Sequence, residues 1–86
     1  ILIGSIKGYP NPSSEQMYLT LDVIQPEHYT ISIYSVLGNK LQTVFDGYLE
    51  SGRHNFSIDL LNLSKGVYFY EVKMRNYSKI DKIIIE

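Results

Sequence analysis

Short runs of alternating apolar and polar residues constrain this chain more than any other feature of its sequence. In residues 17–23 the side chains of Met17, Leu19, Leu21 and Val23 alternate with less apolar neighbours. Successive side chains of a β-strand point to opposite faces of a sheet, so a period of two places one set in a core and the other toward water. The run therefore predicts a strand with one buried face.

The same alternation recurs along the chain and is separated by residues that favour turns. It resumes in residues 29–34, 54–59, 67–74 and 79–85. Pro26 ends the first run because proline has no amide donor for a sheet. Gly38-Asn39 predicts a tight hairpin between residues 32–37 and 40–45, since glycine tolerates a positive φ.

Further interruptions divide the second half of the chain. Asp46-Gly47 and Ser51-Gly52 are interpreted as breaks around residues 48–50. Residues 59–66 are too few for an independent helix, so they predict a loop pinned by Leu60 or Leu63. Strands separated by turns predict an all-β fold, an immunoglobulin-like antiparallel β-sandwich of about seven strands.

The 86 residues suit one small domain, and no cysteine is present to support its core with disulfides. The alternation gives these core candidates: Leu19, Leu21, Val23, Ile31, Ile33, Val44, Phe56, Ile58, Leu63, Tyr68, Tyr70, Val72 and Ile84.

Charge and hydropathy exclude several classes of partner. Eight basic and nine acidic residues give a net charge of −1, which provides no electrostatic footprint for nucleic acid or anionic lipid. No apolar run is long enough to cross a bilayer, and the first residues lack the charged region of an export signal. If the chain is exported, we expect it to be a piece of a longer precursor or to carry its address elsewhere.

No group of residues forms a convincing catalytic or metal site. His28 and His54 are the only imidazoles and lack an evident third ligand, so we expect no metal and no cofactor. There is no nucleophile motif, P-loop or cysteine, so we expect no enzyme. Four carboxylates fall at strand ends or in turns, where we expect bonds to the local backbone: Asp22, Asp46, Asp59 and Asp81.

Tyrosine is abundant, with eight residues, and suggests an alternative function. Tyr68 and Tyr70 are two apart and are expected in the core. An exposed stripe formed by Tyr18, Tyr34 and Tyr48 would instead indicate a carbohydrate-binding or adhesive module that flanks a secreted enzyme.

A set of motifs in a fixed order gives a more specific hypothesis. The prolines of the first motif fix φ and favour a stiff, extended segment. In chain order the motifs are Tyr9-Pro10-Asn11-Pro12, Leu37-Gly38-Asn39-Lys40-Leu41, Lys65-Gly66-Val67-Tyr68-Phe69-Tyr70 and Lys79-Ile80-Asp81-Lys82-Ile83-Ile84-Ile85-Glu86. Over residues 9–86 this succession resembles the type A C-terminal sorting domain of type IX (Por) secretion substrates from Bacteroidetes.

The resemblance implies a secretion signal that performs no chemistry. It implies recognition by the outer-membrane translocon and its shuttle protein, export through the periplasm to the cell surface or medium, and removal by a sortase-like peptidase. Residues 1–8 would be a linker remnant from an upstream passenger, and Glu86 would be the natural C-terminus. An exposed edge strand would also allow two copies to pair as a homodimer.

The residues that correspond to the family motifs are the predicted sorting residues: Tyr9, Pro10, Asn11, Pro12, Gly38, Gly66, Val67, Tyr68, Lys79, Lys82, Ile83, Ile84, Ile85 and Glu86.

Overall fold

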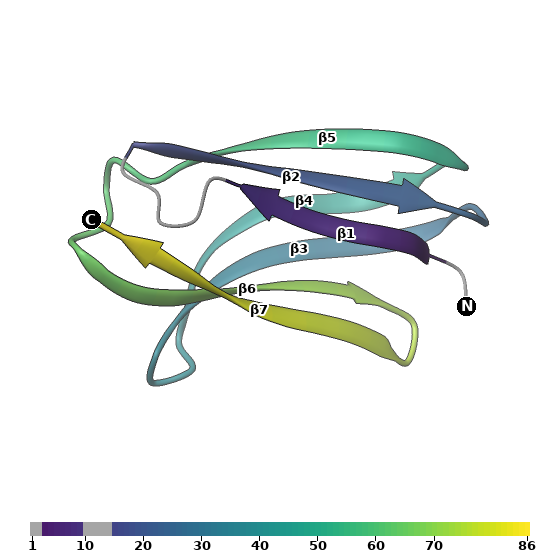
Figure 1. Ribbon diagram of the computed structural model, residues 1–86. Helices are drawn as coiled ribbons and strands as arrows, with labels where there is room; N and C mark the ends of the chain where they lie inside the picture. The colour runs from purple at the N-terminus through teal and green to yellow at the C-terminus, as the bar shows by residue number, and fades with distance from the viewer. Residues whose placement is uncertain (1–2, 10–14) are drawn as a thin grey trace.

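Seven antiparallel strands form two sheets in the computed structural model, which describes residues 3–9 and 15–86 (Figure 1). The strands are β1 (Ile3–Tyr9), β2 (Gln16–Val23), β3 (Glu27–Ser35), β4 (Lys40–Leu49), β5 (Gly52–Asp59), β6 (Gly66–Met74) and β7 (Tyr77–Ile85). One sheet has the order β1-β2-β5 and the other β4-β3-β6-β7. This is the expected immunoglobulin-like sandwich.

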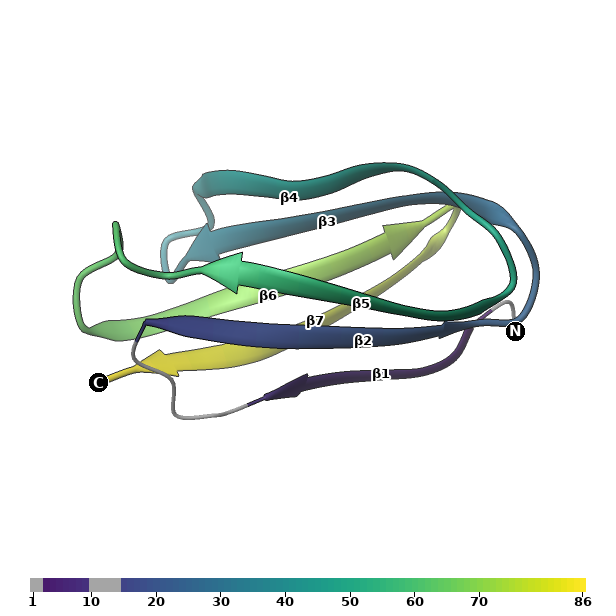
Figure 2. The same ribbon diagram turned by 90° about the horizontal axis from the view of Figure 1, so that it is seen from above.

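The chain crosses between the sheets after β2, β4 and β5, which gives the Greek-key connections of this architecture. Edge strands β1 and β7 lie on the same side of the sandwich, and β1 begins at the end opposite to the one where β7 finishes (Figures 1 and 2).

The core lies between the inner faces of the two sheets and consists of the side chains that alternate inward. Its buried members are Met17, Leu19, Leu21, Val23, Tyr29, Ile31, Ile33, Leu49, Ile58, Leu60, Tyr70, Val72, Met74, Ile83 and Ile85. Of the other candidates, Val44, Phe56, Leu63 and Tyr68 are partly buried against this core. The prediction for Ile84 is wrong, because Ile83 and Ile85 point inward and Ile84 between them faces outward.

The prediction of a break at Asp46-Gly47 is wrong, because both residues lie within strand β4. The strand runs through both residues, and its register with β3 shifts at two irregularities, between Ile31 and Ser32 and between Ile33 and Tyr34. A Cβ on Gly47 would lie 3.1 Å from Cζ of Phe45, so the glycine leaves room for this ring. The ring centroid of Phe45 is 5.1 Å from that of Phe56 across the core.

The loop between β5 and β6 is pinned as expected. Leu60 is fully buried, and its N–H donates to the carbonyl of Glu15 at 2.9 Å. Leu63 donates to the carbonyl of Leu60 at 3.0 Å, and Asp59 accepts from the N–H of Leu61 at 2.9 Å. These bonds satisfy backbone groups that a helix would otherwise pair.

The first residues belong to the sandwich in part. Ile3–Tyr9 forms β1 and pairs with β2, so the folded unit includes residues that the sequence assigns to a linker. The strand ends at Tyr9, which pairs with Tyr18. The rest of the first motif, Pro10 to Pro12, lies outside the described residues.

Candidate functional site

The terminal motif is divided between two faces by the alternation of β7. Ile83 and Ile85 enter the core, whereas Lys82 and Ile84 point to the outer face of the four-stranded sheet. Lys79 is half-buried and lies on the inward set of the same strand. Glu86 follows the strand and is exposed.

The Gly66-Val67-Tyr68 motif opens β6. Gly66 has a φ of +148°, which side-chain-bearing residues rarely adopt. Val67 faces outward and pairs with Ile84, so the two motifs meet on the outer face. Tyr68 faces inward, and its hydroxyl donates to the carbonyl of Ser64 at 2.7 Å.

Gly38 lies in the loop between β3 and β4, which has four residues instead of the tight turn expected. Its φ is +88°, and its N–H donates to the carbonyl of Ser35 at 3.0 Å. Ser35 in turn donates to the carbonyl of Asn39 at 2.9 Å. The hairpin prediction is confirmed, and the loop overhangs the same outer face.

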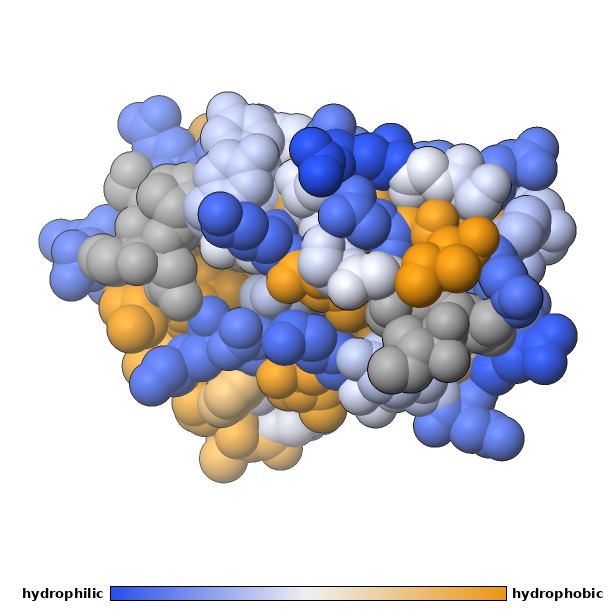
Figure 3. All heavy atoms as spheres, turned by 45° about the vertical axis from the view of Figure 1, so that its right-hand side comes forward, coloured by the Kyte–Doolittle hydropathy of each residue, from blue (hydrophilic) through white to orange (hydrophobic). Residues whose placement is uncertain are grey.

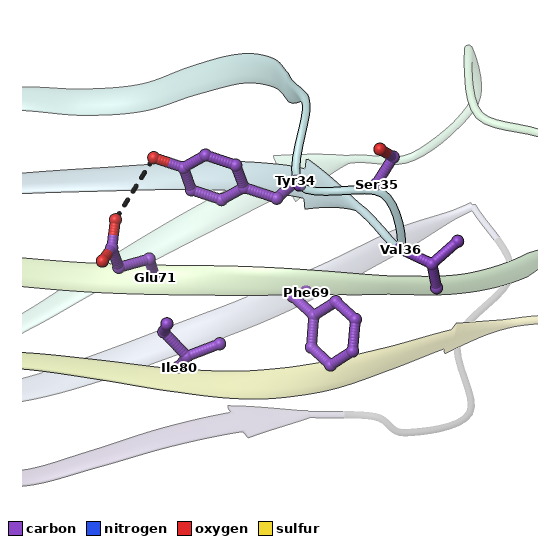
Figure 4. Close-up of a pocket in the computed structure, with 7 residues that line it drawn as sticks. Tyr34, Ser35, Val36, Phe69, Glu71 and Ile80 are labelled. Atoms are coloured by element: carbon purple, nitrogen blue, oxygen red, sulfur yellow. Dashed lines mark hydrogen bonds between the residues drawn. The ribbon is translucent and has the colours of Figure 1, made fainter.

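A hollow of about 340 Å³ lies on this face, between the hairpin loop and the outward side chains of β6 and β7 (Figure 4). We call it the outer groove; it is lined by Tyr34, Ser35, Val36, Gly38, Phe69, Glu71 and Ile80. Ile80 is 60% exposed and Val36 is 63% exposed. Figure 3 shows apolar residues gathered toward the lower end of the molecule, where Figure 1 places the hairpin.

One ordered polar contact borders the outer groove. The hydroxyl of Tyr34 donates to Oε1 of Glu71 at 3.2 Å, and Ser32 beneath this face is buried. Burial, and next the negative charge of Glu71, raise the pKa of Tyr34 above its ordinary value. The tyrosine therefore stays neutral and the carboxylate retains its hydrogen-bond donor at neutral pH.

Sequence reasoning missed most of the groove's apolar lining. Val36, Phe69 and Ile80 were assigned no site role, and Tyr34 was considered only as part of a tyrosine stripe. For Phe69 a signal was present in the apolar run 67–70, because a strand that is apolar at consecutive positions has two apolar faces.

The tyrosines do not form the stripe that the alternative function requires. Tyr18 lies on the three-stranded sheet, where its ring centroid is 5.8 Å from that of Tyr9. Tyr34 and Tyr48 are on the other sheet, where Tyr48 of β4 pairs with His28, six positions along β3 from Tyr34. Nothing in this arrangement favours a carbohydrate-binding module.

The two histidines have local partners. Nε2 of His28 lies 2.6 Å from Oδ1 of Asp46, and Nε2 of His54 lies 2.7 Å from the carbonyl oxygen of Glu50. Within residues 3–9 and 15–86, no three histidine or carboxylate side chains are grouped so as to hold a metal ion.

Two of the carboxylates expected to bond the backbone hold side chains instead. Asp46 pairs with His28, and Asp22 accepts from Arg53 at 2.9 Å and from Ser5 at 2.7 Å. The hydrogen bond from Arg53, followed by that from Ser5, lowers the pKa of Asp22. Asp81 does accept a backbone N–H, that of Lys82, at 2.8 Å.

The sequence model described as "Secretion system C-terminal sorting domain" matches residues 7–86. The chain belongs to this family. It is a C-terminal sorting domain of the type IX (Por) secretion system, a secretion signal without catalytic activity, and the proteins that carry such domains are secreted or surface-attached.

Two relatives place the sorting domain in larger proteins. The chain is 32% identical over 88 residues to the endo-acting ulvan lyase of Formosa agariphila, and the match covers 99% of this chain and 15% of the lyase. The crystal structure of dimeric latent PorU from Porphyromonas gingivalis contains the same fold, with a TM-score of 0.72 and 16% identity over 93% of this chain and 9% of PorU. The sorting domain thus spans a small part of each.

No helix in the part of the sorting domain that the structure describes could cross a membrane.

Proposed function

We propose that this is a type A sorting domain, and that the type IX translocon and its outer-membrane shuttle protein recognise the outer face of its four-stranded sheet. One observation carries the proposal. Gly38, Val67, Lys82 and Ile84 come from three separate motifs, yet they lie on this face around the outer groove. Three further motif residues, Tyr68, Ile83 and Ile85, pack inward behind this face.

The proposed passenger is a secreted enzyme upstream of the domain. The ulvan lyase relative supports this, because the match covers only a small part of that protein. In this proposal the precursor passes through the periplasm and the outer membrane to the cell surface or medium. In this proposal the passenger joins ahead of β1, at the end of the sandwich opposite to the one where β7 finishes (Figure 1).

We further propose that a sortase-like peptidase cuts in the linker upstream of β1, ahead of Ile3. Backbone that is paired in a sheet is poorly available to a peptidase, and β1 is paired with β2 from Ile3 onward. We also propose that two copies pair as a homodimer through an edge strand such as β1.

The test is the delivery of a fluorescent reporter fused ahead of the domain in a host with a type IX system. We expect deletion of residues 82–86 to leave the reporter in the periplasm. Ile84→Asp should reduce surface delivery while leaving the domain folded, because this side chain faces outward. The matched control is Ile24→Asp, at an exposed isoleucine in the turn between β2 and β3. Normal surface delivery of both the truncated and the Ile84→Asp fusions would refute the proposal.

A further inference from the structure

The outer groove is an apolar surface that the fold itself does not cover. Val36 and Ile80 are each more than half exposed, and Phe69 lies between them on β6 (Figure 4). Contiguous exposed apolar side chains on a small domain commonly mark a binding surface. The groove's volume of about 340 Å³ is enough for one large apolar side chain with neighbouring backbone.

Positive charge borders the groove on both sides. Strand register places one residue from each strand in a row across the outer face, in the order Lys40, Tyr34, Phe69, Lys82. Residues that pair directly on neighbouring strands share a face, so the two aromatic rings lie between the two lysines. Glu71, the carboxylate at the groove, is engaged by the hydroxyl of Tyr34.

The spacing of this row specifies what could bind. Lys40 and Lys82 are separated by three inter-strand distances, or about 14 Å between their backbones. An extended peptide advances about 3.3 Å per residue, so its first and fifth residues are about 13 Å apart, and its first, third and fifth side chains share a face. Such a peptide, crossing the strands, would put its third side chain over Tyr34 and Phe69.

We propose that the outer groove binds an extended, acidic peptide segment of a partner protein, with the pattern acid–any–apolar–any–acid. The apolar side chain enters the groove, and the two carboxylates meet Lys40 and Lys82. This rests on the proposed function, because it identifies the chemistry by which a component of the secretion machinery contacts the outer face. The positive charges of Lys40 and Lys82 favour an acidic segment over a basic one.

The test is fluorescence anisotropy of the 86-residue chain with a short labelled peptide that has aspartate at its first and fifth positions and leucine at its third. Control peptides carry lysine for both aspartates, or serine for the leucine. We expect each control to bind about tenfold or more weakly, which corresponds to about 1.4 kcal/mol. Binding should also weaken as salt rises toward about 1 M, because the Debye length shortens to about 3 Å.

Variants of the chain locate the binding surface. Lys40→Glu and Ile80→Ser should each weaken binding of the acidic peptide several-fold. Lys7→Glu, on the three-stranded sheet, and Leu61→Ser, in the loop before β6, are matched controls at exposed positions and should leave it unchanged. Thermal unfolding of all four confirms that the fold is intact.

Three results would overturn the inference: equal binding of the lysine peptide, unchanged affinity in both groove variants, or self-association that Ile80→Ser abolishes without any peptide binding. The last would identify a second copy as the occupant. Reporter delivery separates this inference from the sorting role. Loss of delivery in the Ile84→Asp fusion without peptide binding would refute only the peptide ligand, and peptide binding with normal delivery would refute only the sorting surface.

Discussion

Alanine substitutions at adjacent isoleucines of β7 give a direct test of the fold and of the site's orientation. Ile83 is 1% exposed and pairs with Tyr68, whereas Ile84 is half-buried, faces outward and pairs with Val67. Replacing isoleucine with alanine removes three carbons. Burial of each is worth about 0.8 kcal/mol, and a cavity term raises the cost at Ile83 to about 3–4 kcal/mol. At Ile84 we expect about 1 kcal/mol, because water already reaches the side chain.

The difference is large for a domain of this size. At about 0.05–0.15 kcal/mol per residue, the whole domain has a free energy of unfolding of roughly 4–13 kcal/mol. Urea unfolding should therefore show a much lower midpoint for Ile83→Ala with little change in slope, and the melting temperature should fall by about 12–32 °C. Equal losses at the two positions, or a larger loss at Ile84, would refute the reasoning, because a one-residue slip of β7 would exchange the two faces.

Three further predictions concern stability. Burial, and next the charge of Asp81, raise the pKa of Tyr70 to about 12, so the folded state favours the neutral phenol. Stability should be intact below the unfolded-state pKa of about 10 and fall by up to about 2–3 kcal/mol as the pH rises to about 12. Urea unfolding should show a smaller loss in Tyr70→Phe than in the wild type, because the raised pKa of Tyr34 still contributes. Gly38→Ala should cost about 1 kcal/mol because of the +88° φ, and Gly38→Asn less; similar melting temperatures for all three proteins would contradict this. Gly47→Ala should displace the ring of Phe45 and cost about 1 kcal/mol of aromatic packing, visible as reduced near-ultraviolet circular dichroism, and an unchanged spectrum and melting temperature would contradict it.

The strands were predictable where one face is apolar and the other polar. Residues 17–23 and 54–59 show this pattern and lie in β2 and β5. The prediction failed at Gly47, because glycine usually marks a turn, and here it makes space within a strand for the ring of Phe45. That ring is a neighbour along the strand, and its direction depends on packing across the core.

The site was predictable in its motifs and not in its shape. Local pattern shows that Ile83 and Ile85 share a face and that Ile84 lies on the other. It cannot tell which face the second sheet covers when both are apolar, which is why Ile84 was placed in the core. For the same reason the sequence did not show that Phe69, between Tyr68 and Tyr70, lies on the outer face.

The sequence by itself determined the extended conformation, the approximate strand number and the family, because period-two alternation, turn residues and ordered motifs are local properties of the chain. Only the tertiary structure decided which apolar residues remain outside. Strand register brings Lys40, Tyr34, Phe69 and Lys82 into one row, although they lie up to 48 positions apart, and the stacking of two sheets buries the opposite face. The groove exists because the four-stranded sheet has apolar side chains on both faces, and the three-stranded sheet can cover only one of them.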